Sequence, residues 1–244
     1  MTGKYTARKA IILAAGLGKR LRPITEHTPK ALIEVNGRKI IETILDGLVQ
    51  NEITEVYVIV GHLKEQFEYL PQKYGKIKLE FIENPYYGEC NNISSLYVAR
   101  EHLGDCIIIE GDFIIYNAEI LNPRFEASGY CSLWTEKTDE WLQTIDQNGF
   151  VLSCSRSGGK NGWQLFGISF WNMTDGKKLK YHLEEIFEIN GETDIYWDDV
   201  PMFRRSNEYR LKVRKINRGD IAEVDSFQDL AGIDGSYEEY CRGL

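Results

Sequence analysis

Apolar runs alternate with amphipathic segments along the first half of the chain. The runs at 9–15, 55–61 and 106–110 are mostly apolar, which is typical of strands buried on both faces of a parallel sheet. The segments between them are predicted as helices over 40–48, 64–73 and 92–103, the second ending near Pro71, and as a strand over 77–83. Strands that alternate with helices predict an α/β fold with a parallel sheet and right-handed crossovers.

The pattern changes after Asp112, where short strand-like segments follow one another. Asn148-Gly149 is a dipeptide typical of a hairpin turn, so the strands around it are expected to be antiparallel. The elements predicted here are strands over 130–135, 142–146, 150–155, 165–171 and 221–225, a helix over 174–188, and a last helical segment interrupted at Gly232 and Gly235. We therefore expect a second, partly antiparallel region.

Composition is that of an ordinary globular protein. Of the 244 residues, 43% are hydrophobic and 27% are charged, and the sequence has no repeat, low-complexity tract or linker at which it would divide. We predict one domain over 1–244, made of the halves 1–112 and 113–225 and a C-terminal helical segment over 226–244. The formal net charge of −8 argues against a broad nucleic-acid-binding surface, so no nucleic-acid partner is expected.

The cysteines and the N-terminal region indicate the compartment. The five cysteines are odd in number, widely spaced and never in a CxxC pair, which is typical of reduced thiols rather than of a disulfide framework or a zinc knuckle. The apolar run at 10–15 is much shorter than the ~18 residues of a membrane span and lacks a signal-peptide cleavage pattern. We expect a cytoplasmic protein with no membrane partner, and the sequence leaves the oligomeric state open.

The segment LAAGLGKRLRPITEHTPKAL, residues 13–32, combines glycines, cations and prolines at the end of the first predicted strand. That end lies at the carboxyl edge of the sheet, where α/β proteins bind ligands. Glycines let main-chain N–H groups approach an anion, and prolines restrict the chain so that Lys30 returns to the same place. The glycines, cations and prolines concerned are Gly16, Gly18, Lys19, Arg20, Arg22, Pro23 and Pro29. We name residues 16–30 the cationic loop and predict that it binds a polyanion, rather than being a solvated basic turn.

Two familiar phosphate-binding motifs do not match this loop. A dinucleotide-binding fingerprint requires a third glycine where Leu21 stands. A Walker loop requires glycine in place of Leu13 and a hydroxyl residue in place of Arg20. The predicted polyanion site therefore matches neither of these two motifs.

The segment at 13–32 resembles the signature of the nucleotidyltransferases that join a nucleoside triphosphate to a phosphorylated sugar or alcohol. Within that superfamily, NNISSLYVA, EGDFIIYN, DEW, GISFWN, DIYWDD and EVDSFQDL are similar to bacterial CTP:phosphocholine cytidylyltransferases over nearly the whole chain. The resemblance implies a Rossmann-like nucleotidyltransferase fold, with a mixed, mostly parallel central sheet flanked by helices and a small, partly antiparallel acceptor-binding region. It makes 1–112 the nucleotide-binding half and 113–225 the acceptor-binding half.

The same resemblance implies which residues meet the nucleotide. Arg20 would hold the β- and γ-phosphates and Lys30 the reacting phosphates, while Asn91 or Asn92 would bond the ribose or the base. Lys19 departs from the small hydroxyl residue often found at its position, and an extra cation beside a triphosphate is physically sensible. The residues implied at the nucleotide are Leu13, Ala14, Ala15, Gly16, Gly18, Lys19, Arg20, Asn91 and Asn92.

Two aspartates that follow predicted strands are candidates for a metal site. Asp112 ends the run at 107–111 and Asp225 ends the run at 221–224, so both would lie at the ligand edge if the strands were parallel neighbours. Hard oxygen ligands suit Mg²⁺. An aspartate after a strand is also a common helix cap or turn residue, but these two match the metal-binding aspartates of the family that the chain resembles. Glu110 points the other way along its strand and is a weaker candidate.

Aromatic residues stand among carboxylates in the second half, at DEW and DIYWDD. Such groups hold a quaternary ammonium by cation–π attraction and charge. We predict that Trp141 and Tyr196 contact the acceptor, with the ammonium near Asp194, Asp198 or Asp199; the alternative is ordinary core packing, which we expect for Trp171. The histidines show no metal-ligand spacing and are expected on the surface: His27, His62, His102 and His182.

These features predict an enzyme that transfers CMP from CTP to phosphocholine, giving CDP-choline and pyrophosphate by direct in-line attack on the α-phosphorus. The predicted catalytic residues are Lys30, Arg20 and Asp112, with Mg²⁺ as cofactor. An acceptor such as 2-aminoethylphosphonate or phosphoethanolamine is the alternative, because its primary ammonium would hydrogen-bond to the acidic residues. A sugar-1-phosphate suits the aromatic, acidic second half less well, and the presence of Lys30, Asp112 and Asp225 disfavours a non-catalytic nucleotide sensor.

Overall fold

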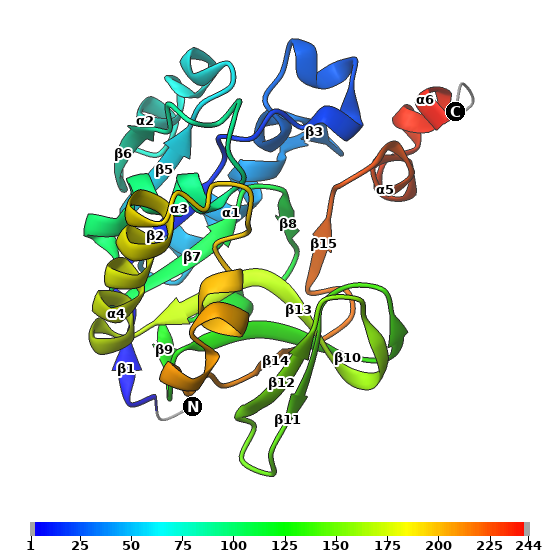
Figure 1. The fold of residues 1–244 in the computed structure, drawn as a ribbon. Helices are drawn as coiled ribbons and strands as arrows, with labels where there is room; N and C mark the ends of the chain where they lie inside the picture. Colours follow the sequence, from blue (N-terminus) through cyan, green and yellow to red (C-terminus); the bar gives the residue numbers. More distant parts are fainter. Residues whose placement is uncertain (1–2, 242–244) are drawn as a thin grey trace.

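Four parallel strands form the centre of the fold in a computed structural model that describes residues 3–241. Strand β2 (Lys9–Leu13) lies between β5 (Glu55–Val60) and β7 (Cys106–Glu110), and β6 (Lys78–Glu83) pairs with β5 on its far side (Figure 1). Both neighbours of β2 are parallel to it, and their carboxyl ends therefore meet at one edge of the sheet. Leu13 is in register with Ile59 on one side and Glu110 on the other.

Antiparallel strands from the second half extend this sheet. Strand β13 (Gly159–Trp171) pairs with β7, and β10 (Gly129–Thr138) pairs with β13. Strands β11 (Leu142–Ile145) and β12 (Val151–Ser155) form the hairpin predicted around Asn148-Gly149, while the short β14 (Arg214–Ile216) runs parallel to β10. The mixed, mostly parallel sheet with a partly antiparallel region is confirmed.

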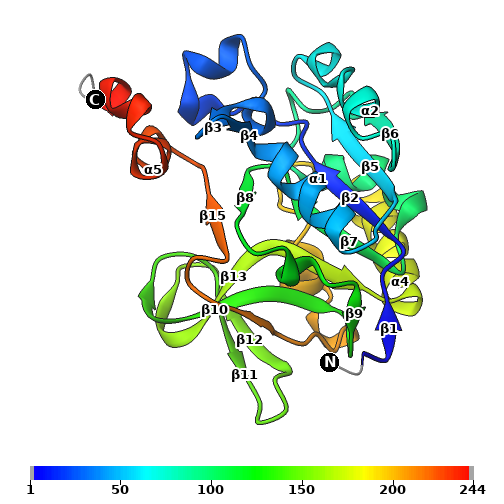
Figure 2. The ribbon, with the colours of Figure 1, turned by 180° about the vertical axis from the view of Figure 1, so that it is seen from behind.

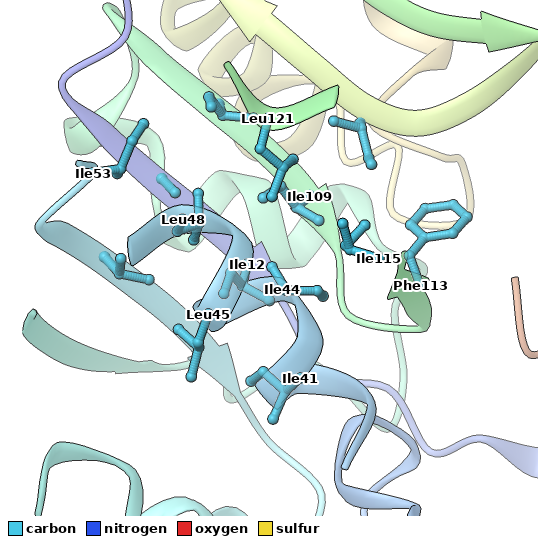
Figure 3. Close-up of a cluster of buried hydrophobic side chains, with 14 of the residues drawn as sticks. Ile12, Ile41, Ile44, Leu45, Leu48, Ile53, Ile109, Phe113, Ile115 and Leu121 are labelled. Atoms are coloured by element: carbon cyan, nitrogen blue, oxygen red, sulfur yellow. The ribbon is translucent and has the colours of Figure 1, made fainter. Parts of the chain in front are cut away.

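Helices cover both faces of the parallel strands. Helix α1 (Ile40–Gln50) packs on one face, and α3 (Ile93–Val98) with α4 (Met173–Leu183) packs on the other (Figures 1 and 2). Figure 3 shows the apolar side of α1 against β2 and β7, where its side chains contribute to one cluster with Ile12 and Ile109. Full burial of an isoleucine or leucine stabilises a fold by roughly 1.5–3 kcal/mol, so this cluster fixes the edge at which β2 and β7 end.

The C-terminal segment leaves the sheet and packs on the cationic loop. Strand β15 (Ile221–Glu223) pairs antiparallel with β8 (Phe113–Ile115), and the chain then forms α5 (Phe227–Ile233) and α6 (Glu238–Cys241) beside β3 (Figure 1). Phe227 and Leu230 of α5 share a buried cluster with Leu21 of the loop. Further short elements include β1 (Tyr5–Thr6) with β9 (Arg124–Phe125), β3 (Glu34–Val35) with β4 (Arg38–Lys39), α2 (Leu70–Lys73), and the π-helical segments Glu184–Ile189 and Val200–Arg204.

Three predicted helices differ from the structure. The segment at 64–73 is a 3₁₀ turn (Lys64–Phe67) followed by α2, and Pro71 lies in the first turn of α2 rather than near the end of a helix. The first turn accommodates proline because its N–H groups have no intrahelical partner. The segment at 92–103 divides into α3 and a 3₁₀ turn at Arg100–His102.

At the C-terminus, Gly232 lies inside α5 and the interruption comes at Asp234, while residues 242–244 lie outside the described part. None of the helices within 3–241 combines the length and the apolar character that crossing a membrane requires.

Candidate active site

A cavity of about 500 Å³ opens at the carboxyl edge of β2 and β7. The cationic loop, the start of α3 and the segment before α3 contribute to its lining. All nine residues predicted at the nucleotide line it, together with Lys30 and both predicted metal ligands: Leu13, Ala14, Ala15, Gly16, Gly18, Lys19, Arg20, Asn91, Asn92, Lys30, Asp112 and Asp225. The structure thus brings these residues together, and their individual roles stay predictions.

Gly18 and Thr25 give the cationic loop its shape. Gly18 has a φ of +59°, a left-handed conformation that favours glycine, and a Cβ there would lie 2.8 Å from the Thr25 side chain. The Thr25 hydroxyl donates to the carbonyl of Gly18 at 2.8 Å, and a ring nitrogen of His62 lies 2.6 Å from the Thr25 carbonyl oxygen. A Cβ on Gly16 would meet nothing within 4 Å, so the main chain there stays open to a ligand.

Lys30 bridges the two predicted metal ligands. Its Nζ donates to Asp112 Oδ2 at 2.8 Å and to Asp225 Oδ1 at 2.7 Å, and Arg20 Nη2 lies 2.6 Å from the same Asp225 oxygen. Burial alone would lower the pKa of Lys30, but the two carboxylates outweigh it and raise that pKa. Burial raises and the cations lower the pKa of Asp225, with a net lowering. Lys30 and Asp225 are therefore both charged at neutral pH.

Asp112 and Asp225 meet because β8 and β15 are antiparallel partners. Asp112 comes immediately before β8 and Asp225 follows β15 by two residues, and the N–H of Val224 donates to the Asp112 carbonyl at 3.1 Å. The assumption of parallel neighbouring strands was wrong, since β15 and β8 form a separate sheet of two strands. In an antiparallel pair, the start of one strand lies beside the end of the other, which brings the two carboxylates together.

Glu223 is a third carboxylate that the sequence reasoning missed. Oxygen atoms of Asp112, Glu223 and Asp225 lie within 4.8 Å of one another. Burial and the two aspartates raise the pKa of Glu223 to about 8, and Asp112 Oδ1 is buried with no hydrogen-bond partner among the described residues. Such an orphaned oxygen beside two further carboxylates fits a hard divalent cation. The signal was available, because residues two apart on a strand share a face.

Asn92, Glu110 and Trp197 join the two halves of the chain beside the cavity. Glu110 Oε1 accepts from Asn92 Nδ2 and from the indole Nε1 of Trp197, each at 3.0 Å. Asn92 Oδ1 accepts from the main-chain N–H of Trp197, also at 3.0 Å. Burial and nearby carboxylates raise the pKa of Glu110 well above its usual value. Glu110 lines the cavity but stands outside the three-carboxylate cluster, and its lower rank as a metal ligand stays a prediction.

The predicted acceptor residues lie in three different environments. Asp194 is exposed and lines the cavity. Among the described residues 3–241, the cavity lining does not include Trp141, Tyr196 or Asp198. The Trp141 and Tyr196 rings pack edge to face with centres 6.0 Å apart. Asp198 is buried, with 8% of its surface exposed.

Two other aromatic and histidine predictions have clear outcomes. Trp171 is fully buried, which confirms the core assignment. His182 is also buried, and the prediction of a surface position was wrong for it. Its ring nitrogens lie 2.7 Å from the Tyr209 hydroxyl and 3.2 Å from a Glu208 oxygen, so polar partners compensate for its burial.

The chain is similar to known nucleotidyltransferases in sequence and in structure. Residues 10–145 match the MobA-like NTP transferase domain. The chain belongs to this family of nucleotidyltransferases. The structure of the CTP:phosphocholine cytidylyltransferase LicC from Streptococcus pneumoniae superposes with a TM-score of 0.84 and 35% identity, over 93% of this chain and 98% of that one. This similarity confirms the predicted nucleotidyltransferase fold.

Two full-length relatives place this nucleotidyltransferase among the cytidylyltransferases. It is 37% identical to the 2-aminoethylphosphonate cytidylyltransferase of Lancefieldella rimae, over 93% of this chain and 92% of that protein. It is also 37% identical to the choline-phosphate cytidylyltransferase of Streptococcus pneumoniae, over 91% of this chain and 94% of that protein. The predicted resemblance to phosphocholine cytidylyltransferases is confirmed, and the two relatives differ in the acceptor that their names state.

Proposed function

We propose that this cytidylyltransferase transfers CMP from CTP to phosphocholine, releasing CDP-choline and pyrophosphate. The observation that carries the proposal is the convergence of Arg20, Lys30, Asp112 and Asp225 in the lining of a cavity that glycine-containing backbone also lines. Catalysis of transfer between two anions requires cations where they meet. Residues 1–112 would hold CTP and residues 113–225 the acceptor.

The reaction needs positioning and charge neutralisation more than acid–base chemistry. A phosphate oxygen of the acceptor forms a bond to the α-phosphorus of CTP while the bond from that phosphorus to the β-phosphate oxygen breaks. A phosphate monoester already carries about −1.5 to −2 charge at pH 7, so no base has to remove a proton. The chain's task is therefore to align the two reactants and to offset their repulsion.

Each cation of the cluster has a separate role in this proposal. Lys30 would neutralise charge at the α-phosphate, and Arg20 would hold the β- and γ-phosphates that leave as pyrophosphate. Arg20 is the more exposed of the two side chains, at 70% against 17% for Lys30, so it is free to follow a ligand. Asn91 or Asn92 would bond the ribose or base, with the main chain of residues 13–18 beside them.

Asp112, Glu223 and Asp225 would hold Mg²⁺, as their oxygens are hard donors close enough to share one ion. Bound there, Mg²⁺ would supply further positive charge to the phosphates. Lys30 and Arg20 pair with these aspartates in the structure, so both cations must exchange partners when the triphosphate and the ion bind.

An aminophosphonate acceptor is the second candidate, favoured by the equal identity to the 2-aminoethylphosphonate enzyme. The primary ammonium would hydrogen-bond to carboxylates such as Asp194, which lies exposed at the cavity. In either case the acceptor contributes a phosphate or phosphonate oxygen for the attack and carries an ammonium group at the end of a two-carbon chain.

Pyrophosphate release tests the function directly. We expect turnover with CTP in preference to ATP, GTP and UTP, and with phosphocholine in preference to 2-aminoethylphosphonate and glucose-1-phosphate. Higher kcat/KM with the phosphonate would replace the first acceptor by the second. Preference for glucose-1-phosphate, or no release with any pair, would refute cytidylyl transfer to an ammonium-bearing acceptor.

A further inference from the structure

Trp141 and Tyr196, which are predicted to contact the acceptor's ammonium, form an aromatic cluster with Phe203, and this cluster already contains a cation of the chain itself. The guanidinium carbon of Arg156 lies 3.9 Å from the ring centre of Phe203 and 5.9 Å from that of Trp141. Both distances are within the ~6 Å range of cation–π attraction. Trp141 in turn packs edge to face against Phe203 at 5.1 Å and against Tyr196 at 6.0 Å. Arg156 thus lies on ring faces that a quaternary ammonium would need.

Arg156 also engages the carboxylate beside this cluster. Its Nη2 donates to Asp199 Oδ1, and Asp199 Oδ2 accepts from the main-chain N–H of Tyr196 at 2.9 Å. Both oxygens of Asp199 therefore have partners, and its side chain is only 5% exposed. A buried carboxylate requires a compensating charge, and here Arg156 supplies it.

The position of Arg156 allows this charge to leave. It follows the last residue of β12, in the turn that leads to β13, and its side chain is 52% exposed. Water can solvate the guanidinium once it leaves, so the cost of breaking this ion pair falls on the buried Asp199 carboxylate. An incoming ammonium would restore the compensating charge beside Asp199 and the cation on the rings.

We propose that Arg156 is a specificity-determining residue that occupies the acceptor-cation position in the free enzyme and leaves it when the acceptor binds. This inference rests on the proposed function, because it takes the aromatic cluster as the place of the acceptor's ammonium. The quaternary ammonium of phosphocholine has no N–H and requires the ring faces, whereas a primary ammonium also requires the oxygens of Asp199. Arg156 competes with both kinds of acceptor, through different contacts.

Replacement of Arg156 by glutamine separates the two contacts. Glutamine can still donate a hydrogen bond to Asp199 but places no positive charge on Phe203 or Trp141. We expect the KM for phosphocholine to fall roughly threefold to tenfold in Arg156→Gln, the size of a cation–π contact, with a smaller fall for 2-aminoethylphosphonate and an unchanged KM for CTP. Arg156→Lys keeps the charge and should keep a KM near that of the wild type.

Arg210→Gln is the matched control, because Arg210 makes a similar contact with Phe150, 4.1 Å from its ring centre. It should leave every KM unchanged. A binding measurement that needs no turnover follows tryptophan fluorescence while tetramethylammonium chloride is added, with sodium chloride as the ionic-strength control. Arg156→Gln should bind tetramethylammonium more tightly than the wild type or Arg210→Gln.

The outcomes distinguish this inference from the proposed function. An unchanged or raised phosphocholine KM in a folded, active Arg156→Gln would overturn the role of Arg156, and a raised one would mean that the guanidinium binds the acceptor. No turnover with any acceptor in the wild type would instead refute the function. If Arg156→Gln melts early, the double variant with Asp199→Asn removes both charges, and tighter tetramethylammonium binding is expected there as well; weaker binding would contradict the proposal.

Discussion

Lys30 forms ion pairs with both of the aspartates proposed to bind the metal ion. Its Nζ bonds to two aspartates that lie 82 and 195 residues away in the sequence. As the proposed neutralising group at the α-phosphate, its loss should remove transition-state stabilisation. We expect Lys30→Ala to lower kcat on the order of 10²-fold, measured by pyrophosphate release. Lys76→Ala, at an exposed position, should keep the wild-type rate. A near-native rate for Lys30→Ala would remove Lys30 from the mechanism.

The same residue should control how tightly the free protein binds a divalent cation. Lys30 lies between Asp112 and Asp225, so an ion at these carboxylates must compete with the Lys30 ammonium. Lys30→Met removes that competitor and keeps most of the side-chain volume. We expect Mn²⁺ to bind the nucleotide-free variant about tenfold more tightly than the wild type, a difference of about 1.4 kcal/mol, measured by electron paramagnetic resonance of free Mn²⁺. Equal or weaker binding than in Lys76→Met would contradict this competition.

At the scale of elements, the start of α5 holds Asp225 in place. The Ser226 hydroxyl accepts from the Asp229 N–H at 3.2 Å, and Asp229 Oδ2 accepts from the N–H groups of Ser226 at 2.7 Å and Asp225 at 3.0 Å. This capping box satisfies main-chain donors at the N-terminal end of α5 and fixes the main chain beside Asp225, a proposed metal ligand.

Removal of the cap should therefore destabilise the protein measurably. We expect Ser226→Ala to lower the free energy of unfolding by about 1 kcal/mol, read from urea denaturation at constant m-value. Ser157→Ala, in an exposed turn, serves as the control and should lie within ~0.5 kcal/mol of the wild type. A Ser226→Ala protein as stable as this control would show that the box is not needed to begin α5.

Elements defined by local pattern were predictable from the sequence, whereas pairings between distant segments were not. The apolar runs of β2, β5 and β7 and the helical spacing in α1 carry their own period, and the structure reproduces them. The pairing of β8 with β15 joins residues more than 100 positions apart, and no periodicity encodes it. The sequence therefore predicted that Asp112 and Asp225 lie close together, but from an assumed parallel arrangement of strands that was wrong. Glu223 was not predicted at all.

Burial of polar residues is decided by the whole molecule, which explains the wrong prediction for His182 and the burial of Asp198. Sequence composition places histidine and aspartate at the surface by default. Both residues are buried instead, His182 in α4 and Asp198 in the segment 194–200. These two segments contribute to one hydrophobic cluster, which also contains Tyr130, Trp171 and Trp197. The number of polar groups enclosed by such packing depends on contacts between both halves of the chain, which no single segment reveals.

Asp198 should make the stability of the whole molecule depend on pH. Burial, with a smaller contribution from Asp199, raises its pKa to about 7, although a nearby Tyr130 hydroxyl opposes the shift. An aspartate in an unfolded chain has a pKa near ~3.9. Between these two values the folded protein binds a proton that the unfolded chain releases. The free energy of unfolding must then fall as the pH rises through this interval, by at most about 1.4 kcal/mol per pH unit for one such group.

The stabilising contribution of the Asp198 proton is thus fully present below ~pH 4, is lost as the pH rises through about 7, and is constant above that. Glu110 and Glu223, whose pKa values are also raised, add slopes of the same sign, so the pH dependence of the wild-type stability alone cannot identify Asp198 as its source.

The variant Asp198→Asn keeps the shape of the side chain but has no proton that titrates. In urea denaturation from pH 5 to 8, the stability of the variant relative to the wild type should therefore rise with pH. The exposed Asp139→Asn should instead parallel the wild type. Parallel curves for Asp198→Asn and the wild type would mean that Asp198 is ionised throughout this range and that its buried carboxylate is compensated by another group.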